Sequence, residues 1–191
     1  DVALLKKAGI TPIAVGAKDQ WPAAHYWFNF ALRDCSTAVM KQSGVDLKFT
    51  NPCFTQAGTD LQKFVATQPF QTGFPGTPAQ TGAGSSAGLI ANGQAAMELQ
   101  GTWDRSVMGG LTPDKKVPSF LGWFPFPSVP GGKGEASAQL GGGDGFSCSL
   151  KAPAVWAQLL EYIARVSVQK RSASLGMDVP VLLFCCWVGE S

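Results

Sequence analysis

Short apolar runs alternate along the chain with longer segments whose apolar residues recur at helical spacing. The runs Ile10–Val15 and Ala95–Gln100 are short and bounded by glycine or polar residues, which predicts strands. Helices are predicted where the spacing is helical: Asp19 to Ala38, Ala57–Gln68, Ser86–Asn92, from Trp103 onward, and Pro153–Val166. This alternation predicts an α/β fold.

Residues that start or stop helices support these boundaries. Asp19 is the expected N-cap of the first long helix, with Pro22 in its first turn. Gly9 is expected to close a preceding helix at its C-terminus. Another strand is expected at Phe146–Leu150, and an exposed turn at Val129–Ala138.

Composition limits the function classes. The 191 residues are 45% hydrophobic and 15% charged, which is enough for one domain, or a domain with part of another. The net charge of +2 gives no case for binding nucleic acid or an anionic membrane surface. Six tryptophans are many for this length, so some are expected at a ligand or partner surface.

The two ends favour a fragment of a longer protein. The chain begins with what looks like the last turns of a helix, with no initiator Met, signal peptide or membrane span. At the other end, the apolar run Val181–Trp187 fits neither strand alternation nor an amphipathic helix.

The five cysteines leave two interpretations open. A disulfide between Cys35 and Cys53 would suit an extracytoplasmic protein, and two free buried thiols fit the pattern equally well. Cys148 alternates with Phe146 and is expected in a core. No Cys or His spacing is typical of a metal site, and His25 is the only histidine, so no metal is predicted.

The segment from Ala95 to Asp104 is the strongest candidate for a binding site. A predicted strand ends at Gly101, where backbone or ligand could approach closely, and Trp103 and Asp104 follow at once. An indole face beside a carboxylate suits a sugar, which has an apolar ring face and a rim of hydroxyl donors. The alternative is a core tryptophan followed by a helix-capping aspartate.

Two further segments offer similar chemistry. Trp21 and His25 lie one helical turn apart and would border one site, although an aromatic face packed in the core is the alternative. The run Gly141–Gly145 lacks the spacing of a phosphate-binding loop. Gly143 and Asp144 instead suggest backbone close to a ligand and a hydroxyl acceptor, and a solvated linker is the alternative.

Asp104 and Asp144 could also be the paired carboxylates of a carbohydrate-active hydrolase. The sequence cannot supply their separation, and sugar-binding sites use carboxylates too. No GxSxG motif is present, and His25 has no recognisable nucleophile beside it. Binding without catalysis is therefore the main hypothesis.

Several of these segments, taken in order, resemble the family 1 extracellular solute-binding proteins, the sugar-capturing subunits of bacterial ABC importers. The matching stretches are Leu5–Ala14, Ala17–His25, Ala95–Trp103, Gly122–Pro127 with Pro130–Gly132, and Leu140–Phe146. Each stretch is weak alone, and the resemblance rests on their common order over about residues 1–176.

The resemblance implies a periplasmic-binding-protein-like type II fold, here mostly one lobe with part of the other. Residues 1–140 would form most of the second, C-terminal lobe, and residues 141–176 a crossover strand and helix of the first. Residues 177–191 depart from the family and are expected to be an aberrant or truncated tail.

The resemblance also implies a function of binding and delivery, with no cofactor. Trp21 and Trp103 would stack on a mono- or oligosaccharide in a cleft between lobes. Asp104, Asp144 and His25 would accept or donate hydroxyl hydrogen bonds beside the Gly143 backbone. Expected partners are the sugar and the permease subunits. The expected location is outside the cytoplasm, with the protein either periplasmic or a cell-surface lipoprotein. Contact with the membrane would come only through the permease or a lipid anchor outside this chain.

Overall fold

The structure is a computed structural model that describes residues 2–142, 149, 151–153 and 155–174. The chain divides into two compact units, Asp1–Gly141 and Gly142–Ser191, and each is described by itself. The predicted Phe146–Leu150 strand, Cys148 and the Val181–Trp187 run lie outside the described residues, apart from Ser149. The assignment of residues 1–140, 141–176 and 177–191 to two lobes and a tail stays a prediction.

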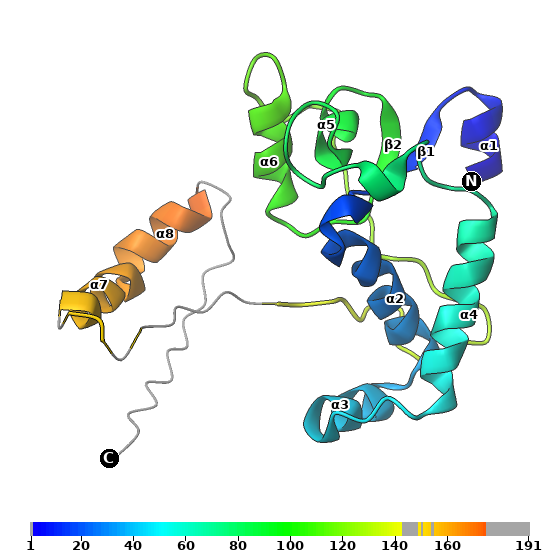
Figure 1. The fold of residues 1–191 in the computed structure, drawn as a ribbon, viewed down its shortest axis with the longest axis horizontal. Coiled ribbons are helices and arrows are strands. Elements are labelled where there is room, and N and C mark those ends of the chain that lie inside the picture. The colour runs from blue at the N-terminus through cyan, green and yellow to red at the C-terminus, as the bar shows by residue number, and fades with distance from the viewer. Residues whose placement is uncertain (1, 143–148, 150, 154, 175–191) are drawn as a thin grey trace. The chain divides into compact units, whose positions relative to one another are not determined.

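The first unit alternates helices with two short strands (Figure 1). Its elements in chain order are α1 (Val2–Lys7), β1 (Thr11–Ala14), the 3₁₀ turn η1 (Ala17–Asp19), α2 (Trp21–Asp34), α3 (Thr37–Asp46), α4 (Pro52–Ala66), the 3₁₀ turn η2 (Phe74–Gly76), α5 (Ser86–Ala91), β2 (Ala95–Glu98) and α6 (Asp104–Leu111). The α/β fold class is confirmed.

The two strands pair in parallel, with Thr11 opposite Ala95 and Ile13 opposite Met97. Parallel strands need a long crossover connection, and here α2 to α5 supply it. An isolated bridge from Ile13 to Phe70 extends the pairing on the far side of β1. Because parallel strands end at the same edge, the segments after β1 and β2 both lead toward one side of this small sheet.

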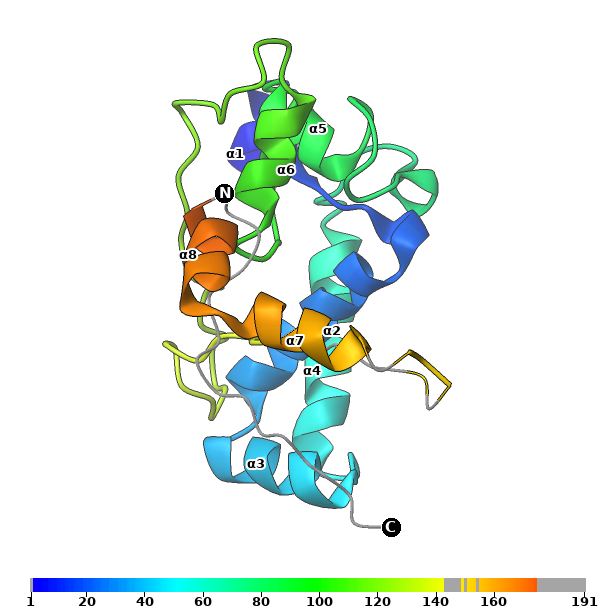
Figure 2. The same ribbon diagram turned by 90° about the vertical axis from the view of Figure 1, so that its left-hand side faces the viewer.

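Helices α2 and α4 lie side by side in both ribbon views (Figures 1 and 2) and bury a cluster rich in aromatic residues. Its fully buried members are Phe30, Ala31, Cys35, Phe54 and Ala57. In the structure the Cys35 and Cys53 sulfurs are bonded, which joins the end of α2 to the start of α4. Of the two interpretations of these cysteines, the structure therefore contains the disulfide.

A long connection after α6 is held against α2 by Arg33, which is 2% exposed. Its guanidinium donates hydrogen bonds to the carbonyl oxygens of Phe126, Pro127, Glu135 and Ala138. The predicted turn Val129–Ala138 thus exists, but part of it contacts the helix, since Gly134 N donates to Arg33 O at 2.8 Å.

Several predicted helix boundaries are corrected. Asp19 does not cap α2: the N-cap is Gln20, without a side-chain bond, and Asp19 Oδ2 accepts from Ala79 N at 2.8 Å. The helix ends at Asp34, because Cys35 is extended and Ser36 caps α3. The predicted helix at Ala57 begins earlier, where Asn51 caps α4.

The second unit contains two described helices, α7 (Val155–Ala164) and α8 (Val166–Ser174). Helix α7 corresponds to the predicted helix Pro153–Val166, and after a break at Arg165 helix α8 extends beyond it. Among the helices that the structure describes, none has the length and apolarity needed to cross a bilayer.

Candidate functional site

Three aromatic side chains from two separate elements meet on the first unit. Trp21 and His25 stand one turn apart at the start of α2, with ring centroids 5.2 Å apart in an edge-on arrangement. The Trp103 ring, just before α6, lies 6.2 Å from the Trp21 ring at an interplanar angle of 58°. The structure therefore brings together Trp21, His25 and Trp103, three of the predicted site residues, as one aromatic site.

The aromatic site is open to solvent. Trp103 is 37% exposed, and Trp21 and His25 are partly buried. Two hollows of about 320 and 370 Å³ lie elsewhere, around Phe70 and Phe74 and beside Lys6 and Thr67. The aromatic site is thus a partly exposed surface of two indole rings and one imidazole ring.

Gly101 is what allows Trp103 to occupy this position. A Cβ atom at Gly101 would lie 2.0 Å from Cζ3 of the Trp103 indole. Only glycine leaves room for a ring so close to the backbone. The close approach predicted at Gly101 is therefore made by the chain's own tryptophan.

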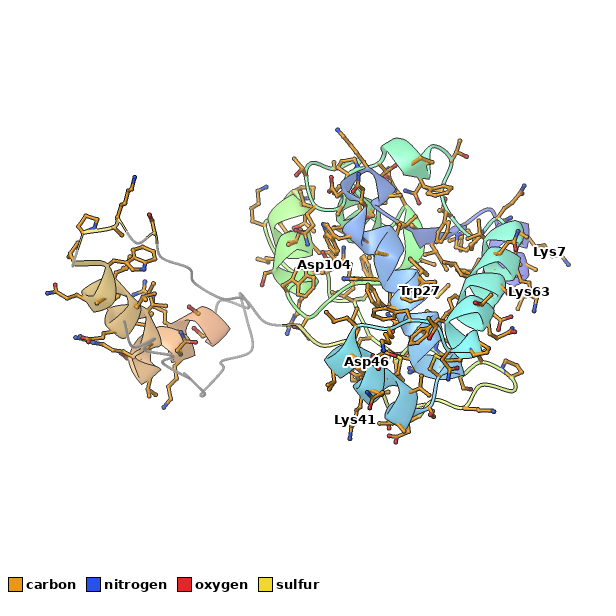
Figure 3. All side chains as sticks on the ribbon, turned by 60° about the horizontal axis from the view of Figure 1, so that its bottom comes forward. Lys7, Trp27, Lys41, Asp46, Lys63 and Asp104 are labelled. Atoms are coloured by element: carbon orange, nitrogen blue, oxygen red, sulfur yellow. A yellow bond between two sulfur atoms is a disulfide. The ribbon has the colours of Figure 1, made fainter. Side chains whose placement is uncertain are left out.

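Asp104 lies beneath the surface, at the first position of α6, and is only 3% exposed. Figure 3 shows Asp104 on the α6 side of the unit. In contrast, the labelled side chains of Lys7, Lys41 and Lys63 are exposed to solvent. Neither of its carboxylate oxygens has a hydrogen-bond donor among the described residues. Its predicted role as a direct hydroxyl acceptor would therefore require the site to open.

Glu98, the last residue of β2, is not among the predicted site residues, and it lies near enough to Asp104 for the two charges to interact. Burial, and then the Asp104 charge, raise the pKa of Glu98, and burial raises the pKa of Asp104. The signal available in the sequence was a carboxyl group at each end of the short connection between β2 and α6. Their proximity depends on the return of the chain after β2.

The electrostatics at His25 suit hydrogen bonding to neutral groups. Partial burial lowers the pKa of His25 below its usual value, which favours the neutral imidazole at physiological pH. A neutral imidazole has one donor and one acceptor nitrogen. His25 is therefore able to pair with a hydroxyl group in either direction.

Gly143 and Asp144 lie outside the described residues, so their predicted places in the site stay predictions. The separation of Asp104 from Asp144, on which the hydrolase alternative depends, is likewise not described. Among the residues described, no group of three His, Cys, Asp or Glu side chains is placed to hold a metal ion.

Comparison with known proteins assigns the chain to a family. The family model of bacterial extracellular solute-binding proteins matches residues 1–163. A search of curated proteins finds no significant match.

Among solved structures, one similar chain comes from work on xylan utilization by the thermophilic bacterium Caldanaerobius polysaccharolyticus. The sequences are 29% identical with a TM-score of 0.63, over 71% of this chain and 34% of that one. This chain thus spans about a third of the length of that relative, and the match is consistent with one lobe of a solute-binding fold. The chain belongs to the bacterial extracellular solute-binding protein family, which places it outside the cytoplasm.

Proposed function

We propose that the chain is part of the carbohydrate-binding subunit of an ABC sugar importer. The observation that carries this proposal is the aromatic site, in which two indole rings and a neutral imidazole meet on an open surface. Indole faces stack on the apolar C–H faces of sugar rings, and the imidazole supplies a hydrogen bond to a hydroxyl group. A neutral oligosaccharide matches this combination better than a charged solute does.

The solved relative supports a sugar as the ligand class, because it comes from work on xylan utilization. In our proposal the sugar lies between this surface and a second lobe, and closure around it is what the permease recognises. The protein releases the sugar unchanged and is not an enzyme. Attachment to the membrane is through the permease or a lipid anchor outside this chain.

The remaining predicted residues take less direct roles in this proposal. Asp104 supports the surface from beneath, since its carboxylate is buried at the start of α6. Gly143 and Asp144 are proposed to approach the sugar from the crossover that follows residue 140.

The test is ligand-observed saturation-transfer NMR on the 191-residue chain, with xylotriose and maltotriose as probes. We expect saturation of sugar ring protons, because weak binding to one wall of a cleft is still visible by this method. Trp103→Ala should weaken binding by roughly tenfold or more, since a tryptophan at the centre of a site is a typical hot spot.

The matched control is Trp123→Ala. Trp123 belongs to the same unit, is 81% exposed and has no ring contact with Trp21 or Trp103. Equal loss in both variants, or no saturation with either sugar, would contradict the proposed site. Recovery of the sugar unchanged after long incubation separates binding from the hydrolase alternative, in which cleaved product would accumulate.

A further inference from the structure

The stretch between the end of α3 and the start of α4 exposes three apolar side chains within five residues. Val45, Leu47 and Phe49 are 81%, 76% and 52% exposed. Helix α3 itself buries only Ser43. Both ribbon views place α3 at the end of the first unit away from α5 and α6 (Figures 1 and 2). These three side chains, the apolar tip, therefore add little to the core of the unit.

The backbone at the centre of the apolar tip is in an unfavourable conformation. Leu47 is the C-cap of α3 and is left-handed, with φ 56° and ψ 27°. Glycine or asparagine usually fills such a position, because a larger side chain crowds the backbone there. Leucine at this place costs stability and, being exposed, regains little of it by burial. Strain of this kind is typical of functional positions.

The apolar tip is also held in place from both sides. The Cys35–Cys53 disulfide closes the loop that contains α3 and the tip. Asn51 Oδ1 accepts a hydrogen bond from Cys53 N at 3.1 Å, which fixes the start of α4. The Phe49 ring packs against the Phe54 ring with centroids 5.1 Å apart. The fold thus fixes the segment that presents these apolar side chains to solvent.

The charges around the apolar tip fit a membrane surface. Lys41 on α3 (Figure 3) and Lys48 within the tip are both exposed. Asp46 lies between them, and its carboxylate accepts from Gln42 Nε2 at 3.1 Å and from Lys48 N at 2.9 Å. The local formal charge is therefore +1. Apolar side chains with lysines beside them suit the boundary between acyl chains and phosphate groups.

A protein surface fits the apolar tip less well than lipid does. Side chains that are 76% and 81% exposed protrude, so a protein partner would need a matching pocket, whereas fluid lipid needs none. A stable protein interface takes about 800 Å² from each partner. Even an aromatic side chain buries at most about 250 Å², so three side chains supply too little apolar area. The same shortfall argues against a second copy of this chain.

We propose that the apolar tip enters the surface of a phospholipid bilayer, with Lys41 and Lys48 against its phosphate groups. The place of the family outside the cytoplasm makes such a surface available to the chain. This contact adds to attachment through the permease or a lipid anchor and does not replace it. The apolar side chains carry it, since the chain as a whole has a net charge of only +2. It is independent of the sugar site.

The test is flotation of the 191-residue chain with vesicles of phosphatidylcholine containing about 30% phosphatidylglycerol. We expect the wild type to float with the vesicles at roughly millimolar lipid, and Leu47→Ser to weaken the partitioning by about tenfold or more. Leu4→Ser is the matched control, since Leu4 is 70% exposed on α1, and it should change nothing. Equal loss in both variants, or a wild type that does not float, would overturn the proposal.

A second variant separates lipid binding from folding. Asparagine suits the left-handed conformation, so Leu47→Asn should be at least as stable as wild type in urea denaturation and yet bind as weakly as Leu47→Ser. Full binding by Leu47→Asn would overturn the proposal, as would a wild type that stays off vesicles and instead dimerises through the tip in analytical ultracentrifugation.

The lipid composition gives the last readout. Vesicles of pure phosphatidylcholine should bind the wild type about fivefold more weakly, which is the effect of one net positive charge near an anionic surface. Complete loss of binding to these vesicles would contradict a contact carried by apolar side chains. Failure of sugar binding would affect none of these readouts, so the two proposals can fail separately.

Discussion

The α2–α4 pair and the turn after β2 are built on opposite principles. The α2–α4 pair buries apolar and aromatic side chains, and a disulfide links its two helices. The turn after β2 lies between the half-buried Glu98 and the buried Asp104, and it carries a tryptophan that is partly exposed. One region thus gains stability from packing and a covalent bond, and the other gives up stability to position a binding surface.

The largest expected effect comes from Arg33→Met on α2. The change removes a buried donor to four carbonyl oxygens, of which that of Glu135 keeps a hydrogen bond from Ala138 N. We expect the free energy of unfolding to fall by about 3 to 5 kcal/mol in urea denaturation, because hydrogen bonds from a buried charged group are strong.

Arg171→Met, at an exposed position on α8, is the control and should change the free energy of unfolding by less than about 0.5 kcal/mol. A similar loss in the two variants would mean that the Arg33 contacts do not stabilise the α2–α4 region.

Removing the disulfide tests the same region by another route. The bond closes a sequence separation of 18 residues. We expect Cys35→Ala with Cys53→Ala to lower the free energy of unfolding by about 3 kcal/mol, through a larger entropy of the unfolded chain. Wild type under reducing conditions should behave like the double variant, and an unchanged denaturation midpoint in both would contradict the expectation.

The raised pKa of Glu98 predicts how stability depends on pH. Burial raises the pKa of Glu98 from 4.5 to about 8. The folded chain therefore holds a proton that the unfolded chain loses near pH 4.5, so stability falls as the pH rises toward 8 and levels off above it.

Relative to Glu98→Gln, wild type should lose about 1.4 kcal/mol per pH unit in that range, measured by urea denaturation at several pH values. Parallel pH profiles for the two proteins would show that Glu98 is ionised in both states.

Gly101→Ala should have the smallest effect on stability and a clear effect on Trp103. The new Cβ would overlap the indole, and the partly exposed ring is free to swing outward. We expect a loss of less than about 1 kcal/mol in thermal or urea denaturation, with altered tryptophan fluorescence. Gly122→Ala, where a Cβ would meet no atom within 4 Å, should change neither, and an unaltered Gly101→Ala spectrum would disprove the close approach.

The local pattern of apolar and polar residues predicts most of the helices and strands of the first unit. The strand at Ile10–Val15 and the helix from Ser86 were placed correctly, because apolar period and flanking breakers are local properties. Helix α3 was not separated from α2, since its apolar residues continue the same spacing and only the Ser36 cap marks the break. Asp19 has a residue type typical of a cap, but its carboxylate instead accepts from Ala79, 60 residues away in the sequence.

The sequence by itself determined the α/β class, the family resemblance and the candidate residues Trp21, His25 and Trp103. All of these depend on residue type and on spacing along the chain. Only the tertiary structure brought the Trp21 and Trp103 rings to 6.2 Å and placed Glu98 near the charge of Asp104. Contacts of this kind depend on how the chain returns after each strand, and the burial that raises the pKa of a carboxyl group exists only once the surrounding elements have packed.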